Sequence, residues 1–132
     1  MDLGLKGKVT IVSAASAGIG KAVAVEMAKE GSDVSICARG KEDLEKAAEE
    51  VRKHGVRVVA VQADVTKADD VQRVIEETVQ AFDRVDVLVN NAGEAWMGHG
   101  VDTTDEEWED SMEVNVYSAV RFTRGVVPYM RK

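Results

Sequence analysis

A run of small residues near the amino terminus could bind an anion through its backbone. The run follows a short β-branched segment, leads into a helical pattern, and consists of Ser13, Ala14, Ala15, Ser16, Ala17, Gly18, Ile19 and Gly20. Small side chains let the backbone N–H groups at the start of a helix approach a pyrophosphate. A tight turn from a strand into a helix would also need glycine, so the run alone favours the two interpretations about equally.

Arg39 bears on whether a dinucleotide bound here would carry a phosphate on its ribose. It ends the second strand-like segment about 20 residues beyond Gly20, where a dinucleotide-binding βαβ unit places the side chain that contacts the ribose. An acidic side chain there would accept a hydrogen bond from a free 2′-hydroxyl, whereas an arginine can pair with a 2′-phosphate. We therefore expect NADP(H) to be favoured, with NAD(H) possible. The alternative is a solvated surface arginine.

Two further marks lie at the ends of later strand-like segments. They are Asp64 and Val65 after the third segment, and Asn90, Asn91, Ala92 and Gly93 at the end of the fourth. Polar and small residues suit a turn after a strand, and for either mark alone a turn is the simpler interpretation.

The pattern of apolar residues predicts elements that would bring these marks together. Four short β-branched runs are expected to be strands, at residues 9–13, 33–37, 56–61 and 85–90. Amphipathic stretches between them are expected to be helices, and a fourth helix is expected to run from Thr104 toward the end of the chain. This alternation predicts an α/β fold, a Rossmann-type doubly wound parallel sheet with about four strands and four helices. Such sheets bind ligands beyond the carboxyl ends of their strands, where these marks fall.

Signals at the ends of helices refine these boundaries. Gly31 and Gly55 lie just past the first two helices, where a left-handed residue closes the last turn. Thr66 is expected to cap the third helix. Thr104 and Glu107 are spaced as a capping box at the start of the fourth.

Composition limits the kinds of partner. The chain has 132 residues, which fits one domain, and its net charge of -7 argues against nucleic acid. No apolar run approaches the ~20 residues that span a bilayer, which argues against a membrane partner. Cys37 is the only cysteine, and the amino terminus shows no export signal, so we expect a cytoplasmic protein. His54 and His99 are far apart and lack cysteine partners, so no metal site is expected.

With these motifs in this order, the sequence resembles the short-chain dehydrogenase/reductases, especially the reductases that act on 3-oxoacyl carriers. The resemblance covers the whole chain and includes a Thr-Gly-x-x-x-Gly-x-Gly-like turn at 13–20, Asp64-Val65, Asn90-Asn91-Ala92-Gly93, and Asn115 within Val114-Asn115-Val116. It implies an NADP(H)-dependent oxidoreductase that acts, when complete, on a small-molecule carbonyl or alcohol and forms a homo-oligomer. With the alternation of elements, it also predicts the strand order 3-2-1-4.

The resemblance also implies roles for single residues. The backbone around Ala15, Ser16 and Ile19 would meet the phosphates and the nicotinamide side of the cofactor. Asp64 and Val65 would meet the adenine, and Asn91 and its neighbours would line the passage for the adenine and ribose and brace the sheet. Asn115 would be the asparagine of a catalytic tetrad, where it holds a water that relays protons to a lysine; otherwise it is an ordinary helix-surface asparagine. The residues expected to bind the cofactor are Ser13, Ala15, Ser16, Ala17, Gly18, Ile19, Gly20, Arg39, Asp64, Val65, Asn91, Ala92 and Gly93.

The chain departs from the family pattern within the turn. The family's threonine is Ser13, which keeps the hydroxyl, and its first glycine is Ala14, whose methyl group crowds the turn. The position before Gly18 is often basic in enzymes that use the phosphorylated cofactor, and here it is Ala17. Arg39 therefore stands alone in favour of NADP(H).

A larger departure concerns the catalytic residues. Family members continue beyond position 132 with a serine and a Tyr-x-x-x-Lys motif that handle the carbonyl and its proton. Neither Tyr117 nor Tyr129 has a lysine four residues later. We therefore expect residues 1–132 to be the dinucleotide-binding part of the domain, without the carboxyl-terminal catalytic part, and the chain alone to be inactive.

Two alternatives belong to other classes. A non-catalytic half-domain could bind nucleotide or a partner chain without turnover, and the absence of the Ser and the Tyr-x-x-x-Lys motif favours this alternative for the 132-residue chain. The edge of the fourth strand and a fourth helix apolar on more than one side would both need covering by a partner. Another Rossmann-type fold, such as a methyltransferase, is disfavoured because it has no need of the Asn90-Asn91-Ala92-Gly93 motif. The substrate stays open; the loop at 96–100 would lie on the substrate side as a lid or as a plain solvated loop.

Overall fold

The computed structural model describes residues 1–96 and 98–132, and its centre is a parallel sheet. The strands are β1 (Val9–Val12), β2 (Asp33–Ala38), β3 (Val58–Gln62) and β4 (Val87–Val89). Their order is β3-β2-β1-β4, and every neighbouring pair is parallel, which confirms the predicted fold class and order. Met97, within the loop expected on the substrate side, lies outside the described residues.

β4 is shorter than the six residues its apolar run suggested. Among the described residues it pairs only with β1, in a register that joins Ile11 to Leu88. A ladder extends only as far as a neighbouring strand offers hydrogen-bonding groups, and β1 itself ends at Val12. The three residues of β4 are also only half-buried, whereas all four of β1 are buried.

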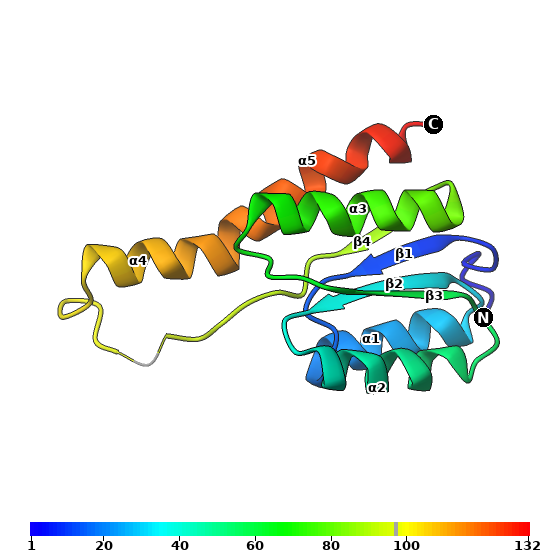
Figure 1. The fold of residues 1–132 in the computed structure, drawn as a ribbon, viewed down its shortest axis with the longest axis horizontal. Coiled ribbons are helices and arrows are strands. Elements are labelled where there is room, and N and C mark those ends of the chain that lie inside the picture. The colour runs from blue at the N-terminus through cyan, green and yellow to red at the C-terminus, as the bar shows by residue number, and fades with distance from the viewer. Residues whose placement is uncertain (97) are drawn as a thin grey trace.

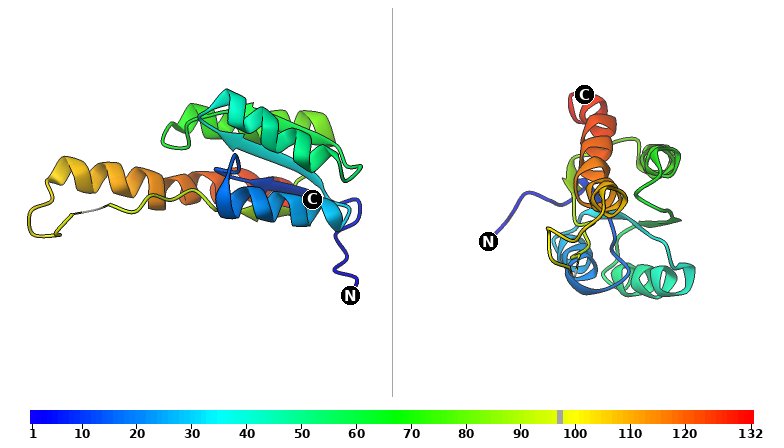
Figure 2. Two further views of the ribbon diagram at one scale, coloured as in Figure 1. Left: turned by 90° about the horizontal axis from the view of Figure 1, so that it is seen from below. Right: turned by 90° about the vertical axis from the view of Figure 1, so that its left-hand side faces the viewer.

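Helices cover both faces of the sheet (Figures 1 and 2). α1 (Gly18–Lys29) and α2 (Lys41–Arg52) pack on one face, in a core of buried residues that includes Ile36 and Leu44. α3 (Ala68–Phe82) and α5 (Ser118–Met130) pack on the other, where Phe122 and Ile75 are fully buried. These are the two layers of helices that a doubly wound sheet requires.

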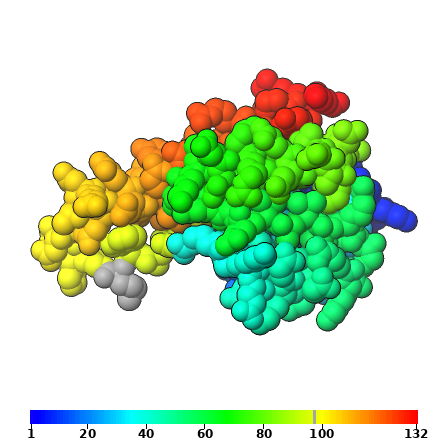
Figure 3. All heavy atoms as spheres, in the orientation of Figure 1, coloured from blue at the N-terminus to red at the C-terminus, as the bar shows by residue number. Residues whose placement is uncertain are grey.

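The predicted fourth helix is one long run of three parts. α4 (Asp105–Met112) leads into a π-helical segment, η1 (Glu113–Tyr117), which continues into α5. α5 packs against α3, but α4 has no buried residue and projects beyond the body of the molecule (Figure 3). The first half of this helix is therefore held mainly by its own local interactions.

The helix ends confirm all but one of the expected signals. Gly31 and Gly55 have φ angles of +86° and +81°, and Thr104 and Glu107 form the capping box. The cap predicted for α3 was wrong: the residue before α3 is Lys67, and no side chain caps the helix. The Thr66 hydroxyl instead donates to the carboxylate of Asp64 at 2.7 Å, because that acceptor lies only two residues away.

Candidate cofactor-binding site

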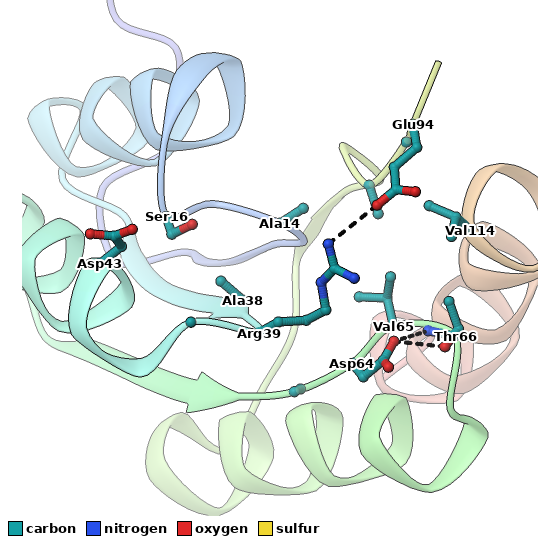
Figure 4. A pocket seen from close by; sticks show the side chains of 14 residues that line it. Ala14, Ser16, Ala38, Arg39, Asp43, Asp64, Val65, Thr66, Glu94 and Val114 are labelled. Carbon is teal, nitrogen blue, oxygen red and sulfur yellow. Dashed lines mark hydrogen bonds and ion pairs between the residues drawn. The ribbon is translucent and has the colours of Figure 1, made fainter. Parts of the chain in front are cut away.

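A cavity of about 360 Å³ opens beyond the carboxyl ends of the strands (Figure 4). The turn after β1, the ends of β2 and β3, and the loop after β4 all reach it, as expected for ligand sites in open parallel sheets. Its walls are formed by Ala14, Ser16, Ala38, Arg39, Gly40, Asp43, Ala63, Asp64, Val65, Thr66, Ala92, Gly93, Glu94 and Val114.

Ser13 ties the turn after β1 to the loop after β4. Its hydroxyl, almost fully buried, accepts hydrogen bonds from the backbone N–H groups of Asn91 at 3.0 Å and Ala92 at 3.1 Å. In the other direction, the side-chain amide of Asn91 donates a hydrogen bond to the carbonyl of Ala14 at 3.0 Å. Ser13 and Asn91 therefore hold two walls of the cavity together through bonds that are internal to the protein.

The turn between β1 and α1 adopts a conformation that suits glycine. Gly18 has a φ of +56°, and Ala14, at the family's first glycine, is also left-handed at +53°. A left-handed residue with a Cβ costs ~1–2 kcal/mol, so Ala14 carries strain that a glycine would not. At Gly20 a Cβ would lie 2.6 Å from the Ala14 carbonyl oxygen and would also meet the Asn91 amide. Gly20 thus allows the contact between α1 and both loops.

The amino end of α1 carries backbone donors with no partner inside the helix. The first intrahelical bond runs from Lys21 N–H to the Ala17 carbonyl, so the N–H groups of Gly18, Ile19 and Gly20 precede it. No side chain caps this end, and its first turn holds no acidic residue. Such an end attracts an anion through its free donors and the helix dipole. The N–H of Ala15, by contrast, is already bonded to the carbonyl of Cys37.

Arg39 reaches across the cavity from the end of β2. Its guanidinium lies 3.2 Å from a carboxylate oxygen of Glu94, in the loop after β4, and the two side chains face each other in Figure 4. On the β3 side, hydrogen bonds from the hydroxyl and the backbone amide of Thr66 hold the pKa of Asp64 below its usual value. Asp64 therefore stands as a fixed anion on the wall.

Asn115 lies in the π-helical segment and secures the loop after β4. Its side-chain oxygen accepts from the N–H of Glu94 at 3.0 Å, and its nitrogen donates to the Glu94 carbonyl at 3.1 Å. The same nitrogen reaches the Ser111 carbonyl one turn back, at 3.0 Å. π-helical turns occur often at functional sites, and here the turn carries the asparagine that the sequence singled out.

The structure thus separates the predicted site residues into three groups. Ser16, Arg39, Asp64, Val65, Ala92 and Gly93 line the cavity. Ser13, Asn91 and Asn115 instead connect its walls by the hydrogen bonds above, and Ala15 is buried beneath the turn. Ala17, Gly18, Ile19 and Gly20 form the entry to α1.

Sequence reasoning missed two charged residues of the cavity, Asp43 and Glu94. Glu94 directly follows Gly93, so its place beside the last motif was a usable signal. Asp43 lies in the first turn of α2, four residues after Arg39, where helical geometry turns it back toward the strand end.

Cys37 does not add chemistry to the site. Burial raises the pKa of its thiol to about 11, so the neutral form prevails and the thiol is a poor nucleophile. Within residues 1–96 and 98–132, no cluster of three His, Cys, Asp or Glu side chains could hold a metal ion. The helices of the same residues include none that is long and apolar enough to cross a membrane.

Comparison with known proteins identifies the family. The family profile described as short chain dehydrogenase matches residues 8–132, which is nearly the whole chain, so this protein belongs to that family. The chain is 39% identical over 130 residues to the uncharacterized oxidoreductase YvrD of Bacillus subtilis, covering 98% of this chain and 49% of YvrD. It is 37% identical over 124 residues to the 3-oxoacyl-[acyl-carrier-protein] reductase FabG of Staphylococcus epidermidis, covering 93% and 51%.

Solved structures of similar proteins support the same family. L-sorbose reductase from Gluconobacter frateurii, complexed with NADPH and L-sorbose, superposes with a TM-score of 0.96 at 41% identity; the match covers 99% of this chain and 50% of the reductase. A xylitol dehydrogenase bound to NAD+ superposes with a TM-score of 0.89 at 31% identity, covering 96% and 49%. The chain therefore spans about half the length of these relatives, and similar structures hold either cofactor.

Proposed function

We propose that residues 1–132 are the dinucleotide-binding part of a short-chain dehydrogenase/reductase that favours NADP(H), with NAD(H) as a weaker ligand. The observation that carries the proposal is the placement of Ser16, just ahead of the uncapped end of α1, and Arg39 on the walls of one cavity. The uncapped end of α1 suits a pyrophosphate, and the guanidinium of Arg39 suits a 2′-phosphate. The reductase bound to NADPH is also 41% identical to this chain.

The remaining residues then take the following roles. The N–H groups of Gly18, Ile19 and Gly20 would bind the pyrophosphate, and Asp64 and Val65 would contact the adenine. Ala92 and Gly93 would line the passage that holds the adenine and ribose, in a loop held by Ser13, Asn91 and Asn115.

A bound nicotinamide would supply or accept the hydride, while this chain orients it. The chain would not by itself reduce a carbonyl or oxidise an alcohol, because the cavity offers no tyrosine–lysine pair to move the proton. Asn115 would act within the complete catalytic group, as the residue that holds a proton-relaying water. Turnover by the 132-residue chain that disappears in Asn115→Ala would contradict this part of the proposal.

Nucleotide titration tests the proposal on the chain itself. Fluorescence of Trp96 and Trp108, or calorimetry, should show saturable binding of NADPH that is tighter than binding of NADH. Arg39→Ala should weaken NADPH by ~1–3 kcal/mol, the scale of a lost charge-assisted contact, and change NADH little. Arg52→Ala is a matched control, because Arg52 lies on the far end of α2 and pairs there with Glu49. Equal losses for both nucleotides in Arg39→Ala would contradict the preference for NADP(H).

A second candidate function, association with another chain, has its own support. α4, η1 and α5 expose a series of large apolar side chains: Trp108, Met112, Val116, Tyr117 and Val120. Apolar patches of this kind mark protein contacts. We propose a homo-oligomer that covers them. Light scattering at tens of micromolar tests this, and a stable monomer would contradict it.

A further inference from the structure

The ion pair between Arg39 and Glu94 joins two walls of the cavity, in the place where a nucleotide ribose would lie under the proposed function (Figure 4). Arg39 is the one cationic side chain among the described residues that line this cavity, whereas three carboxylates, Asp43, Asp64 and Glu94, line it as well. A negatively charged group that enters the cavity therefore meets a local charge that is already negative, and it must share Arg39.

Both partners of the pair are anchored by their backbones. The N–H and the carbonyl of Glu94 are both bonded to the side-chain amide of Asn115, at 3.0 and 3.1 Å. The carbonyl of Arg39 accepts a hydrogen bond from the side-chain amide of Gln62 at 2.9 Å. The two side chains consequently extend from fixed backbone positions on two walls of the cavity.

The pair is exposed enough to open. The side chains of Arg39 and Glu94 are 74% and 44% exposed to solvent, and exposed ion pairs contribute little to stability. A phosphate monoester carries more charge than a carboxylate and offers three acceptor oxygens, so it can take Arg39 from Glu94. After the exchange, however, the displaced carboxylate stays on the same wall, where it repels the phosphate.

We propose that Glu94 is a specificity-determining residue that competes for Arg39 and so weakens the preference for the 2′-phosphorylated nucleotide. The inference rests on the proposed function, because it assumes that a nicotinamide dinucleotide occupies the cavity. A free 2′-hydroxyl makes no demand on Arg39, so NAD(H) does not meet this competition. Glu94 thereby makes the chain less selective for NADP(H) than Arg39 alone would.

The test is the ratio of the Kd of NADH to the Kd of NADPH in Glu94→Gln. Glutamine keeps the size of the side chain and leaves untouched the backbone groups that Asn115 holds. We expect this ratio to rise about tenfold, in favour of NADPH, which corresponds to ~1.4 kcal/mol. The shift should shrink at 1 M salt, where screening shortens the range of the repulsion to about 3 Å. Nucleotide fragments, 2′,5′-ADP against 5′-ADP, should reproduce the shift without the nicotinamide.

Two control variants separate competition for Arg39 from a general charge effect. In an Arg39→Ala background, Glu94→Gln should shift the ratio clearly less than it does in the parent chain, since only the direct repulsion between Glu94 and the phosphate would then remain. Asp43→Asn removes a carboxylate of the same cavity and should shift the ratio less than Glu94→Gln does. Thermal unfolding of each variant verifies that it is folded.

The outcomes distinguish this inference from the proposed function. If the parent chain binds both nucleotides but Glu94→Gln leaves the ratio unchanged, or Asp43→Asn shifts it as much, the role of Glu94 is wrong and the cofactor site stands. If the parent chain binds neither nucleotide, both proposals are overturned.

Discussion

The helices α1 and α4 begin in opposite ways. At α4, the Thr104 hydroxyl accepts from the N–H of Glu107 at 3.2 Å, and the Glu107 carboxylate accepts from the N–H of Thr104 at 2.8 Å. The first turn of α4 also holds three acidic residues, which suit the positive end of the helix dipole. At α1, by contrast, Ala17 is extended, no side chain caps the helix, and no acidic residue is present.

The difference follows from what else holds each helix. α4 buries none of its residues, and a short helix without packing is marginal in water, so its own capping box must stabilise it. α1 buries Gly20, Ala24 and Ala28 against the sheet, and that packing keeps it helical without a cap. A packed helix can leave its first N–H groups to a ligand, whereas an unpacked helix must satisfy its own. The absence of a cap on α1 is thus informative because the rest of α1 is well supported.

The largest expected effect breaks the packing on which α1 depends. Gly20→Ala would place a methyl group 2.6 Å from the Ala14 carbonyl oxygen and against the Asn91 amide, both of which are held by hydrogen bonds. We expect a loss of ~3 kcal/mol in the free energy of unfolding, at the upper end for overpacking, together with loss of nucleotide binding. Denaturant unfolding and titration with NADPH measure the two effects.

Gly40→Ala is the control for that substitution. Gly40 precedes α2, and a Cβ there would have no neighbour within 4 Å. Its stability should stay within ~0.5 kcal/mol of the parent chain, as for most surface changes. A Gly20→Ala chain as stable as Gly40→Ala would show that α1 can move away from the loop, and that its position is not fixed as described.

The comparison also shows which features the sequence could predict. The left-handed Gly31 and Gly55 and the capping box at Thr104 depend on local patterns, whereas the strand order was predicted from the alternation of elements and the family resemblance; the structure confirms all of them. The engagement of Ser13 with Asn91 and Ala92 could not be read from the sequence, because those partners lie 78 and 79 positions along the chain. The pairing of Arg39 with Glu94, 55 positions apart, was hidden for the same reason.

At Thr66, by contrast, a local pattern gave a wrong prediction, the N-cap of α3. A threonine ahead of an amphipathic stretch with two acidic residues is typical of an N-cap. Asp64, however, offers an acceptor to both the hydroxyl and the N–H of Thr66, and α3 starts at Ala68 instead. Two residue types that can each end a turn compete at such a place, and spacing alone does not say which one succeeds.

An intermediate effect is expected from removing the cap of α4. Thr104→Ala should cost α4 ~1 kcal/mol, because the first turn loses the acceptor for Glu107 N–H. Since α4 projects from the body, the loss should appear as faster hydrogen exchange in residues 105–112 more than as a lower midpoint of global unfolding. The Kd of NADPH should stay within about twofold of the parent value.

Thr103→Ala is the neighbouring control for the cap. The Thr103 hydroxyl bonds to the carbonyl of His99 in the preceding loop and makes no capping bond to α4. Exchange in α4 should therefore follow the parent chain. If Thr104→Ala and Thr103→Ala gave the same exchange rates, local capping would not be what holds α4, and the contrast with α1 would lose its physical basis.

The smallest effect concerns the strain at the turn before α1, and its sign is the informative part. Ala14 is left-handed at a φ of +53°, which costs an alanine ~1–2 kcal/mol, while a glycine gives up ~0.4–1 kcal/mol through the greater freedom of its unfolded chain. Ala14→Gly should therefore raise the free energy of unfolding by ~0.5 kcal/mol, and it removes a methyl group from the cavity wall. Ala15→Gly provides the contrast, because Ala15 is fully buried and outside the left-handed region, so the same change should destabilise the chain by ~1 kcal/mol. Denaturant unfolding of both variants gives the two signs. Equal destabilisation would mean that the turn relaxes around Ala14 without strain, and that the alanine at the family's glycine position costs this chain nothing.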